Sequence, residues 1–281
     1  MTYETLRVEH DGSRARVTLA RPDVRNAFNA AMIAELTACF GELADREEMR
    51  AIVLAGEGAS FCAGADVNWM RASVDASEDE NRADAQRMAT MFRAVDECPV
   101  PVVGRVQGVA FGGGVGLVSC CDVVIAAEDA SFCFSEVRLG ILPAVISTFA
   151  LAKIGRGQAR RWFLTAEVLS AARAREIGLV HEVVPPDRLD AGVEGILHAV
   201  CSNGPQAVRE AKALIRRVAE LERGAAIEHC AETIARVRVS REGQEGLRAF
   251  LDKRLPVWRR RGGSAGTLPT AGGEPTGERK A

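Results

Sequence analysis

Residues 112–136 read GGGVGLVSCCDVVIAAEDASFCFSE, and this stretch says most about the fold and the chemistry of the chain. Three glycines run into an apolar segment without charge or proline, which predicts a loop and then a helix from about residue 115. A strand is expected at 122–127 (DVVIAA), and a lone acid, Glu136, follows about one strand later. The stretch therefore predicts a helix that opens at a glycine loop, with one carboxylate further on.

Strand and helix patterns continue on both sides of this stretch. Before it, the sequence predicts strands at 14–20, 51–55 and 101–107, a helix that Asn29 can cap, and a helix around 88–95. The acidic and polar residues 73–84 are expected to form a mobile surface segment. After it, helices are expected at about 155–165, 171–177, 204–222, 224–240 and 243–254, with a short strand at 179–184.

This order predicts an α/β core over residues 1–200 and a helical C-terminal region over residues 201–260. Residues 261–281 are rich in glycine, proline, threonine and alanine and offer almost nothing to bury, so they are expected to be disordered. The net charge of −2 gives no bulk electrostatic argument for a nucleic-acid partner. A polar start and the lack of a long apolar run predict a cytoplasmic protein with no membrane partner.

The eight cysteines form no CxxC pair, and Cys62, Cys120 and Cys133 lie among apolar neighbours, so the cysteines are interpreted as buried, reduced thiols. A nucleophilic cysteine is the alternative, but it has no local signature. The four histidines are scattered along the chain, and none has the spacing of a metal site. We therefore expect no metal ion.

Two loops have the composition of backbone that binds anions. Residues 62–66 (CAGAD) follow a buried strand, and residues 108–114 (GVAFGGG) open a helix. Glycine lets backbone approach a ligand closely, and a helix start presents free N–H groups. One N–H from each loop would make an oxyanion hole for a carbonyl that becomes an enolate. The alternative is that both are glycine turns needed for tight packing; a dinucleotide site is disfavoured because no G-x-G-x-x-G occurs.

Glu136 lies between apolar residues, in SFCFSEVRLGILP. Such an acid is either paired, or placed at a helix start, or a functional group with a raised pKa. Arg138, two residues on, is either its partner or a residue that faces solvent.

Several linked motifs carry a resemblance to a known family. They are RPDVRNAFN, FCAGADVNWM, VQGVAFGGGVGL, SEVRLGILP and LTAEVLSAARAREIGLVHEVVP, in this order along the chain. Together they resemble the crotonase (enoyl-CoA hydratase/isomerase) superfamily, over about residues 4–259. The resemblance implies a ββα superhelical core with C-terminal helices that assemble homotrimers, often hexamers as dimers of trimers. It implies an acyl-CoA thioester substrate and no further cofactor.

The resemblance also implies roles for residues of this sequence. The N–H groups of Ala65 and Gly113 would bind the thioester oxygen, and Glu136 would be the catalytic acid and base. Implied substrate contacts are Arg25, Ala63, Val67, Gly112, Gly116, Phe250 and Lys253.

The departure from the family pattern is Gly116. Hydratases that use two glutamates carry the second one there, and the two acids share the attacking water. A glycine has no side chain to hold water, which favours either an isomerase with one carboxylate or a specialised hydratase. RVRVSREGQEGLRAFLDKRLPVW and the motifs around Gly116 resemble bacterial methylglutaconyl-CoA and isohexenylglutaconyl-CoA hydratases, whose substrates bear an extra carboxylate.

The working hypothesis is that this substrate carboxylate, or bound solvent, orients the water. A cation would then be needed nearby, and Arg138, Arg71 and Lys153 are candidates. The sequence thus favours an enoyl-CoA hydratase of leucine or acyclic-terpene breakdown. An enoyl-CoA isomerase, a decarboxylating relative and a catalytically silent acyl-CoA-binding protein are the alternatives.

Overall fold

The main sheet has six strands in the order β1-β2-β3-β4-β6-β9. The computed structural model describes residues 2–260, without the side chains of Ser73 and Arg260. The strands are β1 (Leu6–Asp11), β2 (Arg14–Leu19), β3 (Ala51–Gly56), β4 (Val102–Val106), β6 (Val123–Ala127) and β9 (Glu182–Val184). β1 and β2 form an antiparallel hairpin, and the other pairs are parallel. All six residues of β3 are buried, as expected for a parallel strand with both faces covered.

A second, smaller sheet contains β5 (Val109–Phe111), β7 (Ser131–Cys133) and β8 (Leu169–Ser170). β4 continues into β5 and then into helix α4 (Gly113–Cys120); β6 continues into β7, the 3₁₀ turn η2 (Glu136–Leu139) and helix α5 (Ala144–Thr165). A strand of the large sheet, a strand of the small sheet and a helix thus recur in order. This repeat confirms the α/β, ββα fold class expected from the sequence.

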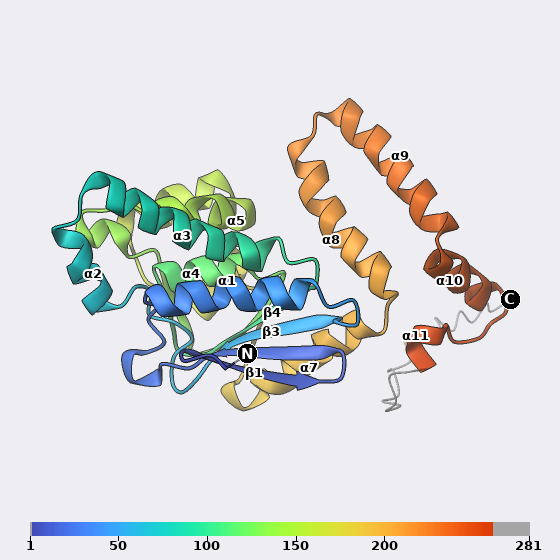
Figure 1. Cartoon of the computed structure of the whole chain (residues 1–281), viewed down its shortest axis with the longest axis horizontal. Helices are drawn as coiled ribbons and strands as arrows, with labels where there is room; N and C mark the ends of the chain where they lie inside the picture. Colours follow the sequence, from blue (N-terminus) through green and yellow to red (C-terminus); the bar gives the residue numbers. More distant parts are fainter. Residues whose placement is uncertain (1, 261–281) are drawn as a thin grey trace, which may run out of the picture.

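Helices cover both faces of the large sheet (Figure 1). One layer contains α1 (Ala30–Ala44), α3 (Glu78–Asp96), α4 and α5, which pack over the main core. α7 (Leu189–Cys201) lies on the opposite face, against β3, β4 and β6. The remaining short elements are η1 (Pro22–Val24), α2 (Val67–Val74), α6 (Ala171–Glu176) and η3 (Pro186–Arg188).

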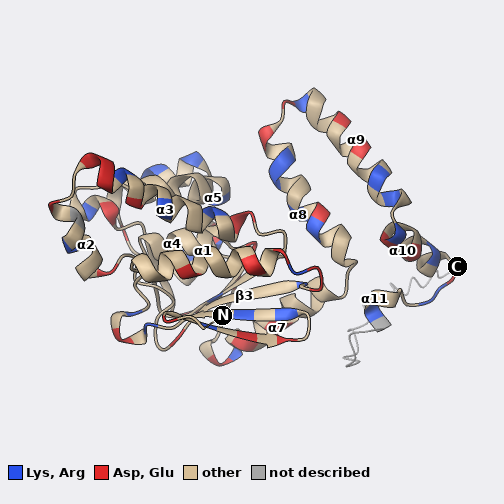
Figure 2. Cartoon of the chain, viewed as in Figure 1, with Lys and Arg blue, Asp and Glu red and all other residues tan. Residues whose placement is uncertain are grey.

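Residues 205–260 form a C-terminal arm that extends away from the core (Figure 1). It consists of α8 (Pro205–Glu220), α9 (Arg223–Val239), α10 (Arg241–Leu251) and the short α11 (Val257–Arg260). Basic and acidic residues are interspersed along α8 and α9 (Figure 2). Large apolar side chains of the arm are nevertheless open to solvent, since Ile215 is 75% exposed and Phe250 81%. The helical C-terminal region expected from the sequence is therefore present, and its apolar surface has no cover within the described chain.

The structure differs from the sequence-based expectations in several places, and α2 is one helix that was not expected. Residues 73–84 are mostly helical, because Ser77 and Glu80 form a capping box that starts α3. α5 begins at Ala144 rather than near residue 155, and Gly155 (φ 69°, ψ 164°) interrupts it. The sequence analysis did not identify α7 as a helix. Residues 261–281, expected to be disordered, lie outside the described residues.

All eight cysteines are free thiols, and six of them are buried, as expected. Among residues 2–260, no helix combines the length and apolar character that crossing a bilayer requires.

Candidate active site

Short parallel strands bring three distant loops to one edge. Cys62 forms a parallel bridge with Ala110, and in the neighbouring pair Phe111 lies opposite Cys133. The chain leaves these three positions in the same direction. Ala65 follows Cys62, Gly113 follows Phe111, and Glu136 follows Cys133 within a few residues. The sequence motifs that suggested a common site therefore do meet in space.

The loop that carries Ala65 packs directly on the glycine loop. Phe28 and Ala65 form a parallel bridge in which Phe28 N–H donates to Gly64 O (2.8 Å) and Asp66 N–H donates to Phe28 O (3.0 Å). Since the bridge uses the groups on either side of Ala65, its own N–H points away from Phe28. A Cβ built on Gly64 would lie 3.5 Å from the nitrogen of Gly113 and 2.8 Å from the carbonyl oxygen of Phe111. Glycine at position 64 thus allows the close approach of the two loops.

Gly113 is the first residue of α4, two residues earlier than expected. Its predecessor Gly112 adopts φ 50° and ψ −122° and provides no side-chain cap. The first N–H groups of a helix have no partner within it, so the N–H of Gly113 is a donor at the positive end of the helix dipole. A Cβ on Gly113 would lie 2.1 Å from Cζ of Phe28. Only glycine lets the helix start this close to the ring.

An ion pair that the sequence analysis missed holds the Ala65 loop in place. Asp66 accepts a hydrogen bond from Nη2 of Arg21 at 2.7 Å and caps α2 by accepting from the N–H of Asn68 at 2.8 Å. The hydrogen bond from Arg21 lowers the pKa of the Asp66 carboxyl. Arg21 also donates to the carbonyl of Ala27. An aspartate directly before a helix is a recognisable capping signal, although its arginine partner is not.

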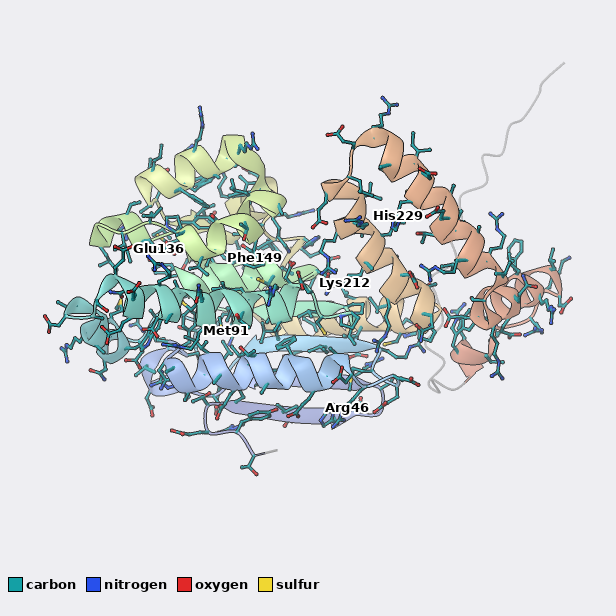
Figure 3. The ribbon with its side chains drawn as sticks, turned by 45° about the horizontal axis from the view of Figure 1, so that its top comes forward. Arg46, Met91, Glu136, Phe149, Lys212 and His229 are labelled. Carbon is teal, nitrogen blue, oxygen red and sulfur yellow. The ribbon has the colours of Figure 1, made fainter. Side chains whose placement is uncertain are left out.

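Glu136 begins η2 at this edge, and Figure 3 shows it at the end of the core away from His229 on α9. Its Oε2 is buried and has no hydrogen-bond partner among the described residues. Burial raises the pKa of the carboxyl. Arg138 is exposed and donates to the carbonyl of Ala166 rather than to Glu136, so of the two expected placements it is the solvent-facing one. Of the three possibilities left open by the sequence, the structure therefore fits two, a carboxylate at a helix start and a group with a raised pKa, and it shows no ion pair of Glu136 among residues 2–260.

Hydrocarbon fills the space beside Gly116. A Cβ there would lie 2.4 Å from Cγ2 of Ile146 and 2.8 and 2.9 Å from two ring carbons of Phe92. The Phe92 ring in turn packs on Phe149, with centroids 5.9 Å apart. A second carboxylate therefore has no room at this position unless Ile146 or Phe92 moves. The apolar residues responsible come from α3 and α5, and the sequence analysis did not identify them.

The predicted substrate-binding residues fall into two groups. Ala63 N–H donates to the carbonyl of Arg25 at 2.9 Å, and Val67 starts α2 with 60% of its surface exposed, so these three lie at the rim of the same loops. Phe250 in α10 and Lys253 just beyond it belong to the C-terminal arm, at the opposite end of the molecule from α2 (Figure 1). Within one chain the structure does not bring them to the site.

The three candidate cations are also separated. Lys153 donates to the carbonyl of Cys121, just past the end of α4 opposite to Gly113. An eight-residue helix is about 12 Å long, so Lys153 is remote from the oxyanion end. Arg71 is exposed on α2 and contacts Asn68 at 3.3 Å. Arg71 and Arg138 are thus the candidates that remain on the side of the site.

Within residues 2–260, the N–H groups of Ala65 and Gly113 donate to no backbone carbonyl, and the half-buried carboxylate of Glu136 lies at the same edge. This arrangement suits enzymes that polarise a carbonyl and move a proton on an adjacent carbon. Comparison with known proteins agrees with this class. Residues 9–261 match the Enoyl-CoA hydratase/isomerase family, and the chain belongs to that family.

Relatives and solved structures resemble the chain over nearly its whole length. The crotonyl-CoA hydratase of Syntrophomonas wolfei is 34% identical over 258 residues, which cover 90% of this chain and 97% of that protein. The crystal structure of an enoyl-CoA hydratase from Shewanella pealeana superposes with a TM-score of 0.87 at 40% identity, covering 91% of this chain and 96% of the other. Pseudomonas aeruginosa AtuE gives a TM-score of 0.88 at 37% identity, covering 91% and 100%.

Proposed function

We propose that this protein is an enoyl-CoA hydratase, which adds water reversibly across the C2=C3 double bond of a 2-enoyl-CoA thioester. The observation that carries the proposal is the Glu136 carboxylate, whose Oε2 is buried without a partner among residues 2–260, at the same edge as Ala65 and Gly113. The family and the hydratases among its relatives support the same reaction. No metal or further cofactor enters the proposed reaction.

In the proposed mechanism the thioester oxygen accepts hydrogen bonds from the N–H groups of Ala65 and Gly113. Water attacks C3, and Glu136 takes a proton from it as the C3–O bond forms. The electron pair of the double bond moves toward the thioester oxygen as an enolate, which the two donors stabilise. Glu136 then delivers the proton to C2, so that one hydrogen and one hydroxyl are added in total. The raised pKa of Glu136 suits an acid that must both accept and return a proton near neutral pH.

We propose further that the substrate is a branched enoyl-CoA with an additional carboxylate, as in methylglutaconyl-CoA. The sequence resemblance to such hydratases supports this choice, and so does the closed space beside Gly116, which leaves no room for a second protein carboxylate. Arg71 or Arg138 would attract the substrate carboxylate. Both cations are exposed, and each donates one hydrogen bond within the chain, Arg138 to the carbonyl of Ala166 and Arg71 to the side chain of Asn68.

The test is a product assay by mass spectrometry with methylglutaconyl-CoA, crotonyl-CoA and a 3-enoyl-CoA. Hydration should be fastest with methylglutaconyl-CoA. Equal hydration of crotonyl-CoA would exclude the contribution of the substrate carboxylate, and no hydrated product from any 2-enoyl thioester would exclude the hydratase. Arg71→Gln and Arg138→Gln should raise KM for methylglutaconyl-CoA without changing KM for crotonyl-CoA if either binds the carboxylate.

An enoyl-CoA isomerase is the second candidate, and the apolar wall of Ile146 and Phe92 is the observation that favours it. One carboxylate can move a proton between carbons without an attacking water. In heavy water an isomerase would exchange hydrogen at carbon and shift the double bond of the 3-enoyl-CoA, and it would form no hydroxyacyl product.

We also propose that the chain assembles as a homotrimer or a hexamer. The exposed apolar side chains of the C-terminal arm support this assembly, because such a surface is normally covered. Phe250 and Lys253 would then reach coenzyme A only from a neighbouring copy. Sedimentation equilibrium of the full chain tests the assembly, and a monomer at micromolar concentration would exclude it.

A further inference from the structure

The proposed hydration needs a second group on the attacking water, and Gly116 does not supply one. A water that loses one proton to Glu136 is best aligned when another polar atom fixes its second hydrogen. The Gly116 side of the site is closed by Ile146 and Phe92. A polar group of the protein that acts beside the substrate carboxylate would therefore lie on another wall of the site.

The hydroxyl of Ser135 is placed on such a wall. A Cβ built on Gly112 would lie 3.4 Å from Oγ of Ser135 and 3.7 Å from Oε1 of Glu136. Both oxygens thus face the bare backbone of Gly112, whose positive φ of 50° disfavours any side chain there. The missing side chain leaves a small hollow bounded by a hydroxyl and a carboxylate.

The hydroxyl is also unused within the chain. Ser135 is the N-cap residue of η2, where a serine normally accepts a hydrogen bond from the following backbone. No such bond forms, and within residues 2–260 the Ser135 hydroxyl has no hydrogen-bond partner. The side chain is half-buried rather than sealed, so a small molecule has access to it. The Glu136 oxygen that faces Gly112 with this hydroxyl is Oε1, and Oε2 of the same carboxylate is buried without a partner among residues 2–260. A free hydroxyl beside such a carboxylate is a site for one water.

We infer that Ser135 binds the attacking water together with Glu136 and takes the place of the second acid that Gly116 lacks. This inference rests on the proposed hydratase function. Oγ of Ser135 accepts a hydrogen bond from one hydrogen of the water, and Glu136 removes the other as the oxygen bonds C3. Ser135 gives up no proton in the step, so Glu136 alone carries the proton to C2. The arrangement separates water alignment, at Ser135, from proton transfer, at Glu136.

The test compares two reactions in the full-length protein. Hydration of the 2-enoyl-CoA needs the water, whereas deuterium exchange at C2 of a saturated acyl-CoA in heavy water needs only Glu136 and the two N–H donors. Ser135→Ala should lower kcat for hydration by roughly 10- to 100-fold, the size expected for one hydrogen bond in the transition state. Exchange at C2 and the KM for the thioester should change less than about twofold. Ser135→Thr, which keeps the hydroxyl, should restore most of the hydration.

Ser202→Ala, a serine beyond the end of α7, is the matched control and should leave both reactions unchanged. Equal hydration by Ser135→Ala and the unmodified protein would overturn the inference. An equal loss of hydration and exchange would also overturn it, since that pattern indicates a structural role for Ser135. If the unmodified protein hydrates none of the thioesters but performs exchange, the proposed hydratase function fails first, and the role of Ser135 falls with it.

Discussion

Gly113 and Gly116 lie three residues apart on α4, and the two ends of that short interval differ in chemistry. At Gly113 the missing side chain makes room for the ring of Phe28, and the N–H of Gly113 has no partner within its own helix. At Gly116 the missing side chain makes room for Ile146 and Phe92, which close the site with hydrocarbon. Glycine therefore leaves a backbone donor accessible at position 113, which we call the open wall of the site. At position 116 it lets apolar side chains fill the space, which we call the closed wall. The difference shows that the absence of a second acid at Gly116 is a packed feature, because neighbouring residues occupy the space.

The largest expected effect is at Glu136, the acid that is proposed to transfer the proton. Glu136→Gln keeps the shape and removes the base, so the turnover number should fall by about 10²- to 10⁴-fold. Binding of coenzyme A thioesters, measured by calorimetry, should stay within about twofold, since Gln retains the contacts that do not involve proton transfer.

Glu128→Gln, which changes an exposed acid in the turn between β6 and β7, is the control and should leave turnover unchanged. Full activity of Glu136→Gln would show that another group transfers the proton.

A methyl group added at Gly113 should disrupt the N–H donor that is proposed to bind the thioester oxygen. Gly113→Ala places Cβ against Phe28, which displaces the ring or the helix start and misaligns the N–H. The value of kcat/KM should fall by about 10²-fold, the usual cost of one oxyanion donor. Overpacking should lower the free energy of unfolding by about 1–3 kcal/mol, measured in urea.

Gly157→Ala in α5 is the matched control, because nothing lies within 4 Å of its Cβ position. It should stabilise the protein by about 0.5–1 kcal/mol or leave it unchanged. Unchanged kinetics in Gly113→Ala would remove Gly113 from the proposed site.

A second acid introduced at Gly116 should not fit, because Ile146 and Phe92 fill the space there. Gly116→Glu forces a carboxylate into the space of Ile146 and Phe92 and should lower the free energy of unfolding by about 2–4 kcal/mol. Hydration of crotonyl-CoA should not increase.

Removing part of the wall sharpens this prediction. The double variant Gly116→Glu with Ile146→Ala should be less destabilised than the sum of the two single changes, because the alanine makes room for the acid. If the two changes in the free energy of unfolding, measured in urea, were strictly additive, Ile146 would not occupy the space that the acid needs.

The smallest expected effect is a pH-dependent gain in stability. Burial raises the folded-state pKa of Glu136, so ionised Glu136 destabilises the fold and protonated Glu136 does not. The melting temperature of Glu136→Gln should therefore exceed that of the unmodified protein above the raised pKa. This difference in melting temperature should shrink as pH falls through that pKa toward the ordinary glutamate range. Differential scanning calorimetry between about pH 4 and 8, at steps of about one pH unit, measures it. A difference that grows at low pH would contradict the assignment of burial as the cause.

Local patterns in the sequence predict the ingredients of the site better than its surroundings. The glycines of 112–114, the acid at Glu136 and the buried strand β3 each carry a local signal, and the structure brings the loops they mark to one edge. Ile146, Phe92 and Arg21 act through contacts with residues far along the chain, so no local pattern indicates them. Capping explains one difference in the fold, since the Ser77–Glu80 box makes a helix of residues whose charge and polarity favoured a loop.

The buried thiols beside the site have a consequence for the proposed substrate. A 2-enoyl thioester is a Michael acceptor, and a thiolate near its C3 would add to it covalently. Cys62 forms an isolated bridge with Ala110 shortly before Ala65, and burial raises its pKa to about 12. Cys133, at the end of β7, precedes Glu136, and burial raises its pKa as well. Both sulfurs therefore stay protonated near neutral pH and are poor nucleophiles. The close packing around Cys62 and Cys133 therefore keeps both thiols from adding covalently to the proposed substrate.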